Sequence, residues 1–464
     1  MKRREFLRNS ICAALGGAGL YSALGSLRLV EAATRAYGPM AFDDYKALVC
    51  VFLYGGNDGL NTVVPTDATH YAQYATARAT LAVPQNRLLQ LTPQAGGGAS
   101  DGAGYGLQAG TNPDDAIGTS GLQGLFNQGR AAILGNVGTL LRPVTKAQFQ
   151  NGSVPLPPQL FSHNDQAAYW QVSRTDDGRN LGWGGRIADL LHDASPMAQI
   201  PMAISLNAES GLGRAADTSE YVIGSDGPQY FGQFEWDEDR RRAMLALMAQ
   251  DTQSNALERS FARSFHRARD NANAVGTALE GAPALATPFP AGRLADELRM
   301  VARLISVRAA LGLKRQIYFV SLGGFDHHDQ LLTDHPLLLS ELSQALTAFY
   351  AATVELGVAN SVTTFTASDF GRTLSSNGDG SDHGWGSHHF VLGGAVRGGR
   401  FYGRMPVLQN DGPDDAGWGQ IIPTTSVDQY AATLARWFGV ADTDLDLIFP
   451  NLGNFASRNL GFMG

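Results

Sequence analysis

Long apolar runs alternate along the chain with stretches whose apolar residues recur at helical spacing. The runs lie at residues 47–54, 131–137, 202–206, 316–320 and 362–366. Unbroken runs of this length, rich in β-branched and aromatic residues, are typical of strands covered on both faces. The stretches with helical spacing lie at residues 294–305, 338–349 and 427–437. This alternation predicts an α/β fold with a mostly parallel central sheet.

Two segments depart from this pattern. Residues 92–121 are rich in Gly, Ser and Asp, and we expect a long surface loop there. Residues 209–290 begin loop-like and continue as an Arg-rich helix, with apolar positions at Leu257, Phe261 and Phe265. We interpret this second segment as a helical insertion or cap packed on the core, with His266 an ordinary helical residue.

The first 32 residues have the features of an export signal. Arg3 and Arg4 precede Phe6-Leu7, a mild apolar run follows at residues 11–27, and residues 30–32 offer a small-residue cleavage site. We predict a cleaved twin-arginine signal that engages the twin-arginine export machinery, leaving residues 33–464 in the periplasm or secreted. The run is short for a membrane span, so no stable span is expected after cleavage. A retained anchor is the alternative reading.

The composition of the chain limits the classes of protein to which it can belong. The chain has 464 residues, of which 44% are hydrophobic and 17% charged, as suits a compact enzyme. The signal holds five basic and two acidic residues, so its removal changes the formal net charge from −8 to −11. A chain with this net negative charge gives no reason to expect nucleic-acid binding. The mature chain keeps only Cys50, expected as an inert core residue, which excludes internal disulfides and cysteine-based zinc sites.

Acids and histidines follow several of the predicted strands. Asp58 follows the first strand, Asp326 and His328 follow the strand at 316–320, and Asp369 follows the strand at 362–366, with His383 in the next loop. The carboxyl ends of parallel strands share one sheet edge, so these side chains are expected to meet. Carboxylates with imidazoles suit one or two divalent ions: Zn, Mn, Mg or Ca. For Asp58 alone, an ordinary Asn-Asp-Gly turn is the competing reading.

Ser162 stands immediately before a predicted helix. Its position suits an N-cap, with Asp165 at the capping-box position. It also suits a nucleophile at a helix N-terminus, where free N–H groups favour a phosphate or sulfate. The two roles are compatible, and His163 is placed to assist in either.

The loop after Asp369 holds further polar residues. Arg372 is placed to clamp the nonbridging oxygens of a phosphate or sulfate ester. The roles of His327, His388 and His389 are left open, and His335 is expected to be an exposed residue or one near a helix N-terminus.

Several of these segments together resemble a known family. They are the paired-arginine signal, Gly-Gly-Asn-Asp-Gly-Leu-Asn (55–61), Ser-His-Asn-Asp-Gln (162–166), Gly-Gly-Phe-Asp-His-His (323–328), Ser-Asp-Phe-Gly-Arg-Thr (368–373) and Asp-His-Gly-Trp-Gly (382–386). Over nearly the whole mature chain they resemble an exported bacterial domain-of-unknown-function family, which is grouped with the alkaline phosphatase and sulfatase superfamily. The resemblance implies an alkaline-phosphatase-like three-layer sandwich.

The resemblance also implies a two-metal site. Asp58 resembles the aspartate after the first strand, and Ser162 resembles the nucleophile. Asp326 and His328 resemble the pair on the next metal, Asp369 resembles the bridging-side aspartate, and His383 resembles a late histidine ligand. The chain departs from the superfamily in having Phe370 rather than His after Asp369 and a tighter spacing at 326–328. It has no Cys-x-Pro-x-Arg motif, which argues against a formylglycine sulfatase.

Together these features lead us to expect an exported, metal-dependent hydrolase of phosphate or sulfate esters, acting on a small-molecule or polymer substrate. The alternative is a non-catalytic exported protein that keeps the fold and binds metal for structure or assembly.

Overall fold

The computed structural model describes residues 42–111, 121–174, 180–230, 237–249 and 255–464. The predicted export signal lies outside these residues. The strands are β1 Lys46–Leu53, β2 Val63–Pro65, β3 Leu88–Gln90, β4 Tyr105–Gln108, β5 Ala131–Gly138, β6 Ala203–Leu206, β7 Glu220–Ile223, β8 Arg315–Leu322, β9 Val362–Ser368, β10 Ser387–Leu392, β11 Phe401–Tyr402 and β12 Thr425–Ser426.

The central sheet has nine strands in the order β11-β5-β10-β9-β1-β8-β6-β7, with β12 beside β5. Strands β9, β1, β8, β6 and β7 run parallel to one another. Strand β10 runs antiparallel to both β9 and β5. The predicted mixed α/β fold with a mostly parallel sheet is therefore confirmed. Because β10 is reversed, it begins at the same edge where β1, β8 and β9 end.

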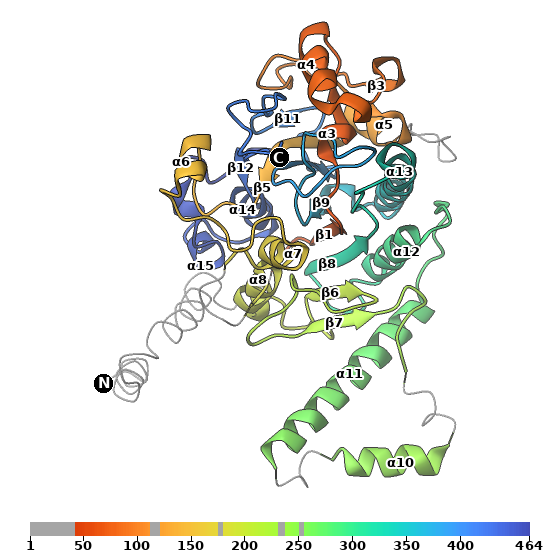
Figure 1. Cartoon of the computed structure of the whole chain (residues 1–464). Coiled ribbons are helices and arrows are strands. Elements are labelled where there is room, and N and C mark those ends of the chain that lie inside the picture. Colours follow the sequence, from red (N-terminus) through yellow and green to blue (C-terminus); the bar gives the residue numbers. More distant parts are fainter. Residues whose placement is uncertain (1–41, 112–120, 175–179, 231–236, 250–254) are drawn as a thin grey trace.

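Helices cover both faces of this sheet (Figure 1). The helices are α3 Gly59–Thr62, α4 Ala68–Arg78, α5 Gly121–Asn127, α6 Lys146–Asn151, α7 His163–Val172, α8 Trp183–Leu191, α10 Glu238–Leu247, α11 Ala256–Glu280, α12 Arg293–Ser306, α13 Leu331–Glu355, α14 Val427–Phe438 and α15 Leu445–Ile448. Alternate side chains of β1 enter two different cores: Val49 packs in the core with α12 and α13, and Cys50 in the core with α8 and α14. Burial raises the pKa of the Cys50 thiol, which keeps it protonated and unreactive.

Helix α13 is long and apolar enough by composition to cross a membrane, but 56% of its apolar window is buried inside the protein. It packs against α12 and belongs to one of the two main cores. Its apolar composition is therefore explained by burial on the sheet.

The segment expected as a long surface loop at 92–121 contains regular structure. Strand β4 lies between β2 and β3 in a separate three-stranded antiparallel sheet, and all four of its residues are buried. A Cβ on Gly106 would lie 3.0 Å from the carbonyl oxygen of Leu89 and 3.2 Å from Cβ of Leu88. The glycine therefore reflects close packing rather than a loop.

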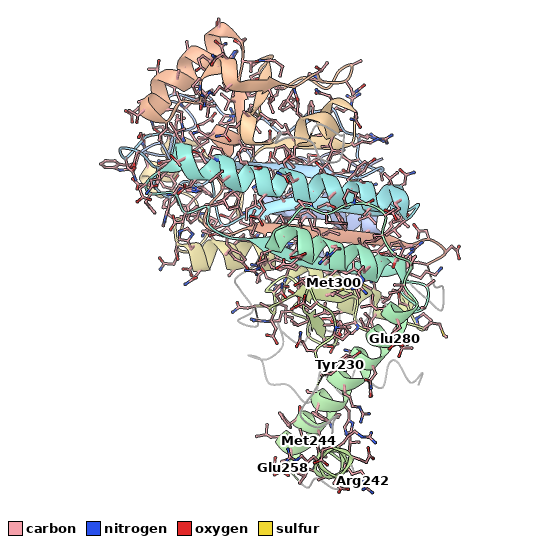
Figure 2. The ribbon with its side chains drawn as sticks, turned by 90° about the vertical axis from the view of Figure 1, so that its right-hand side faces the viewer. Tyr230, Arg242, Met244, Glu258, Glu280 and Met300 are labelled. Carbon is pink, nitrogen blue, oxygen red and sulfur yellow. The ribbon has the colours of Figure 1, made fainter. Side chains whose placement is uncertain are left out.

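The Arg-rich segment forms an arm of two helices, α10 and α11, that projects from the domain (Figure 2). Arg242, Met244 and Glu258 lie at its far end, and Glu280 lies near the domain. Phe265 is buried, whereas Leu257 and Phe261 are exposed, so only part of the expected apolar face packs. Strand β7 lies within the range expected as an insertion, yet it pairs with β6 at the edge of the main sheet.

Candidate metal centre

Three segments far apart in sequence meet at the carboxyl edge of the sheet. The turn after β8 carries Asp326 and His328, the loop between β9 and β10 carries His383, and α7 begins with His163. The reversed direction of β10 explains why a residue just before it lies beside residues that follow β8.

His163 and His328 each turn Nε2 toward Nε2 of His383. The Nε2 atom of His383 lies 3.0 Å from Nε2 of His163 and 3.0 Å from Nε2 of His328. Oxygens of Asp326 lie 3.1 Å from Nε2 of His328, 3.4 Å from that of His163 and 3.5 Å from that of His383. Ligand atoms of His163, Asp326 and His383 all lie within 4.8 Å of one another, which suits a shared metal ion.

The other ring nitrogen of each histidine faces an oxygen. Nδ1 of His163 lies 2.6 Å from Oδ2 of Asp369, and Nδ1 of His328 lies 3.2 Å from Oδ1 of Asp382. Nδ1 of His383 lies 2.7 Å from the carbonyl oxygen of Phe161, which can only accept, so this Nδ1 carries the proton. Burial also lowers the pKa of His383, which favours its neutral form. Its Nε2 lone pair is then free for a metal.

This arrangement fits a metal site on chemical grounds. Ligating histidines ordinarily donate the second ring N–H to a carboxylate or a backbone carbonyl, which fixes ring orientation. With the ring proton on each Nδ1, Nε2 atoms 3.0 Å apart would repel through their lone pairs, and a divalent ion would relieve that repulsion. Three imidazoles with one carboxylate suit zinc better than magnesium or calcium, which prefer oxygen ligands.

The guanidinium of Arg372 binds Asp326 and two backbone carbonyls. Its Nη1 donates to Oδ1 of Asp326 at 2.7 Å and to the carbonyl of Gly55 at 3.3 Å, and its Nη2 donates to the carbonyl of Ser381. Its side chain is fully buried, so it does not lie open to clamp an ester. Burial acts to raise the pKa of Asp326, but the hydrogen bond and charge of Arg372 outweigh it, and the pKa is lowered. Asp326 therefore stays ionised.

Asp369 contacts Nδ1 of His163, the ring nitrogen that does not face His383. Its Oδ2 accepts from the Gly55 amide at 3.0 Å in addition to facing Nδ1 of His163. Burial raises its pKa, against the opposing hydrogen bond to His163. The structure thus places Asp369 beside the candidate ligand His163 rather than among the converging nitrogens.

Asp58 lies apart from the converging nitrogens. It caps α3, its Oδ1 accepts from the amide of Asn61 at 3.1 Å, and its Oδ2 forms a fully buried ion pair with Arg78. Arg78 also donates to the carbonyl of Thr373 at 2.7 Å. Both carboxylate oxygens of Asp58 are engaged within the protein, which leaves one cluster of candidate ligands among the described residues.

Ser162 occupies the N-cap position of α7 but makes no capping hydrogen bond through its side chain. Its Oγ instead donates to Oδ2 of Asp165 at 2.5 Å. Phe161, just before it, has a positive φ of 70° and supplies the carbonyl that holds His383. Ser162 therefore lies directly between Phe161, whose carbonyl contacts His383, and His163.

Four other histidines, His327, His335, His388 and His389, lie in the interior. His335, expected as exposed or near a helix N-terminus, is near the start of α13 but fully buried, with Nε2 3.0 Å from Oδ1 of Asn57. Burial lowers the pKa of His388 to about 4 and that of His389 to about 3. His327 is also buried, and burial lowers its pKa.

The sequence predicted only an assisting role for His163, and it gave no role to Asp382 or to the carbonyl of Phe161. Two signals pointed to them: His163 directly follows the serine at a helix start, and Asp382 directly precedes His383. A backbone carbonyl has no sequence signal of its own.

A family model described as Protein of unknown function (DUF1501) matches residues 45–416. The chain belongs to this family. The matched range includes all four converging residues and the side chains that support them. No curated protein matches the chain.

Several solved structures are similar over most of the chain. PsFucS1 sulfatase from Pseudoalteromonas sp. is 11% identical, with 90% of this chain and 72% of that chain covered and a TM-score of 0.30. The lipoteichoic acid synthase LtaP from Listeria monocytogenes is 9% identical, with 92% and 81% covered and a TM-score of 0.36. Ps i-CgsB in complex with k-i-k-neocarrahexaose is 10% identical, with 89% and 77% covered and a TM-score of 0.32. Because these identities and TM-scores are low, the function has to be argued from the chain's own residues.

Proposed function

We propose that this chain is an exported hydrolase of phosphate or sulfate esters that uses one divalent ion, with zinc the best fit. His163, Asp326, His328 and His383 would hold the ion. The observation that carries the proposal is the convergence of three Nε2 atoms while each Nδ1 faces an oxygen. The proposal includes an alkaline-phosphatase-like three-layer arrangement, which helices on both faces of the sheet support.

When bound, the ion would act as a Lewis acid toward the ester. The chain's own residues would do the rest. Arg372 holds Asp326 ionised and in place, while Asp369, Asp382 and the Phe161 carbonyl fix the three rings. This division replaces the expected roles of Arg372 as an ester clamp and of Asp369 as a direct ligand.

Ser162 is the proposed nucleophile. Its Oγ would attack phosphorus or sulfur, and its proton would pass to Asp165, whose Oδ2 it already faces. The bond to the ester oxygen then breaks, and the departing alcohol takes a proton from water. The hydroxide left by that water would then hydrolyse the phosphoseryl or sulfoseryl ester, and Asp165 would return its proton to the Ser162 oxygen.

The metal part is tested on protein purified after native export. Elemental analysis should find about one zinc per chain, and a chelator should lower the melting temperature. Asp326→Ala and His383→Ala should weaken zinc binding at least about 100-fold, beyond the roughly 10–100-fold typical of outer-shell changes. His266→Ala is the control, because His266 lies in the arm with Nε2 against the Met248 carbonyl. A parent protein that binds neither zinc nor manganese would refute the site.

The catalytic part is tested with 4-nitrophenyl phosphate and 4-nitrophenyl sulfate. Ser162→Ala should lower turnover by at least about 1000-fold. Its melting temperature should change little, because Ser162 Oγ makes no capping bond. If the metal-loaded parent cleaves neither ester, nor a wider panel of phosphate and sulfate esters, the non-catalytic alternative is favoured. Cleavage that persists in Ser162→Ala would remove serine as the nucleophile.

A further inference from the structure

Trp418 is the most exposed large hydrophobic side chain among the described residues, with 88% of its surface open to solvent. Tryptophan is the side chain with the most apolar surface to lose from contact with water, and it is usually well buried. The exposed indole leaves a large apolar surface available for contact with a ligand.

The backbone around Trp418 is firmly held. Residues 415–421 form a tight turn closed by an antiparallel bridge between Asp415 and Ile421. Oδ1 of Asp415 accepts from the amides of Gly417 at 2.9 Å and Gly419 at 3.0 Å, on either side of the tryptophan. Trp418 itself has a φ of 61°, a conformation that glycine or asparagine adopts more readily. The chain therefore holds a bulky aromatic residue where turn chemistry favours a small one.

The same turn contacts the candidate metal centre. Gln420 Nε2 donates to the carbonyl of His383 at 3.3 Å. The carbonyl of Gly419 accepts from the amide of Leu374 at 2.7 Å, in the loop that also carries Arg372. Two trans peptide units separate Trp418 from Gln420, so their Cα atoms lie at most about 7.6 Å apart. Trp418 thus lies on a turn that is hydrogen-bonded to the loop carrying Arg372 and His383.

We propose that Trp418 is a stacking platform at the rim of this centre and binds the ring of a pyranose that carries the phosphate or sulfate ester. The inference rests on the proposed function and names its substrate class. One face of a pyranose presents C–H groups that suit the electron-rich face of an indole, while its hydroxyls stay in water. A platform open over most of its surface fits such a ring better than an aromatic ligand, which gains most when both faces are covered.

The test measures binding and hydrolysis separately, using zinc-loaded protein with glucose 6-sulfate and glucose 6-phosphate as probes. Trp418→Ala should weaken binding of the sugar esters about tenfold, as expected for the loss of one aromatic contact. Trp418→Phe should retain most of the binding, since it keeps a ring. Met197→Ala is the control, because Met197 is also highly exposed, at 77%, but lies far along the chain from the turn. Propyl sulfate and glycerol 3-phosphate serve as esters without a ring.

The proposal predicts that Trp418→Ala lowers the preference for ring esters over these acyclic esters, whereas Met197→Ala leaves it unchanged. Equal binding of glucose 6-sulfate and glucose 6-phosphate by Trp418→Ala and the parent would overturn it, as would a parent that binds neither sugar ester. A Trp418-dependent dimer in light scattering would also overturn it, by assigning the indole to a second copy of the chain. Binding that depends on Trp418 without hydrolysis would support the platform while removing the proposed catalytic function.

Discussion

The ten histidines of the chain fall into distinct environments at the scale of single residues. Those at the candidate metal centre each have an oxygen partner at Nδ1 and turn Nε2 toward the carboxylate of Asp326. His389 packs in β10 against Trp170 with Nδ1 3.3 Å from Oγ1 of Thr366, and its buried Nε2 has no hydrogen-bond partner among the described residues. The buried surroundings of His389 keep its ring neutral, whereas Nε2 of each histidine at the candidate metal centre faces other ligand atoms.

His389 gives a prediction for the pH dependence of stability. Its pKa falls from the ordinary 6.5 to about 3 on folding, because burial opposes the charged form. Below pH 6.5 the unfolded chain binds a proton that the folded chain refuses, so stability falls as the pH drops toward 3. At pH 5 this costs about 2 kcal/mol. His389→Phe should therefore show a smaller loss of unfolding free energy between pH 8 and pH 5 than the parent, measured by denaturant titration.

Comparing each protein with itself at pH 8 removes the constant cost of fitting a larger ring. His70→Phe is the matched control, because His70 is partly exposed and pairs with Asp67 at the surface. An unchanged acid sensitivity in His389→Phe would mean that His389 is not a source of the acid response.

The loop between β9 and β10 is the decisive element of the site. It folds back on itself: the Gly371 amide donates to the Trp385 carbonyl at 2.9 Å, and the Gly384 amide to the Gly371 carbonyl at 2.7 Å. Arg372 and His383 face each other across this hairpin as a bridge pair. A Cβ on Gly384 would lie 2.5 Å from the Arg372 carbonyl carbon. Glycine is required there by the close approach of two backbones.

Gly384→Ala is accordingly expected to push the two sides of the hairpin apart and displace His383 from His163. Zinc affinity should fall about 10-fold or more, and stability should fall by about 1–3 kcal/mol, as for other overpacked sites. Gly323→Ala is the control, since it lies in a loop at the same sheet edge but has nothing within 4 Å of an added Cβ. Calorimetric zinc titration separates the two variants, and equal affinities would contradict this view of the hairpin.

On the scale of the whole molecule, the candidate metal centre comes together only once the fold is complete. The Nδ1 of His163 meets Asp369 across 206 positions of the chain, and its Nε2 meets His383 across 220. An unfolded chain therefore holds no preformed cluster of these side chains, and binding of a metal by them would be linked to folding. The predicted twin-arginine route generally carries folded proteins, which would allow the metal to be bound before export.

Replacement of Arg3 and Arg4 by Lys should leave the precursor in the cytoplasm, because the paired arginines define the predicted signal. Cell fractionation followed by immunoblotting gives the periplasmic share. Arg8→Lys is the control, since it lies outside the pair and keeps the positive charge. Undiminished periplasmic protein in the double variant would exclude the twin-arginine assignment. Metal content of the retained precursor would show whether loading precedes export.

The sequence by itself determined the longest strands of the central sheet and the edge where the candidate ligands lie, but not β4 or β7. Apolar runs are local signals, and Asp326, Asp369 and His383 follow or precede strands whose ends the alternation already marks. Tertiary structure decided which of these side chains face one another. Asp58 and Asp369 read alike in sequence, yet Asp58 meets the buried Arg78 and Asp369 meets His163. Hydrophobic periodicity records burial residue by residue, whereas the partner of a polar side chain depends on packing between segments far apart in the chain.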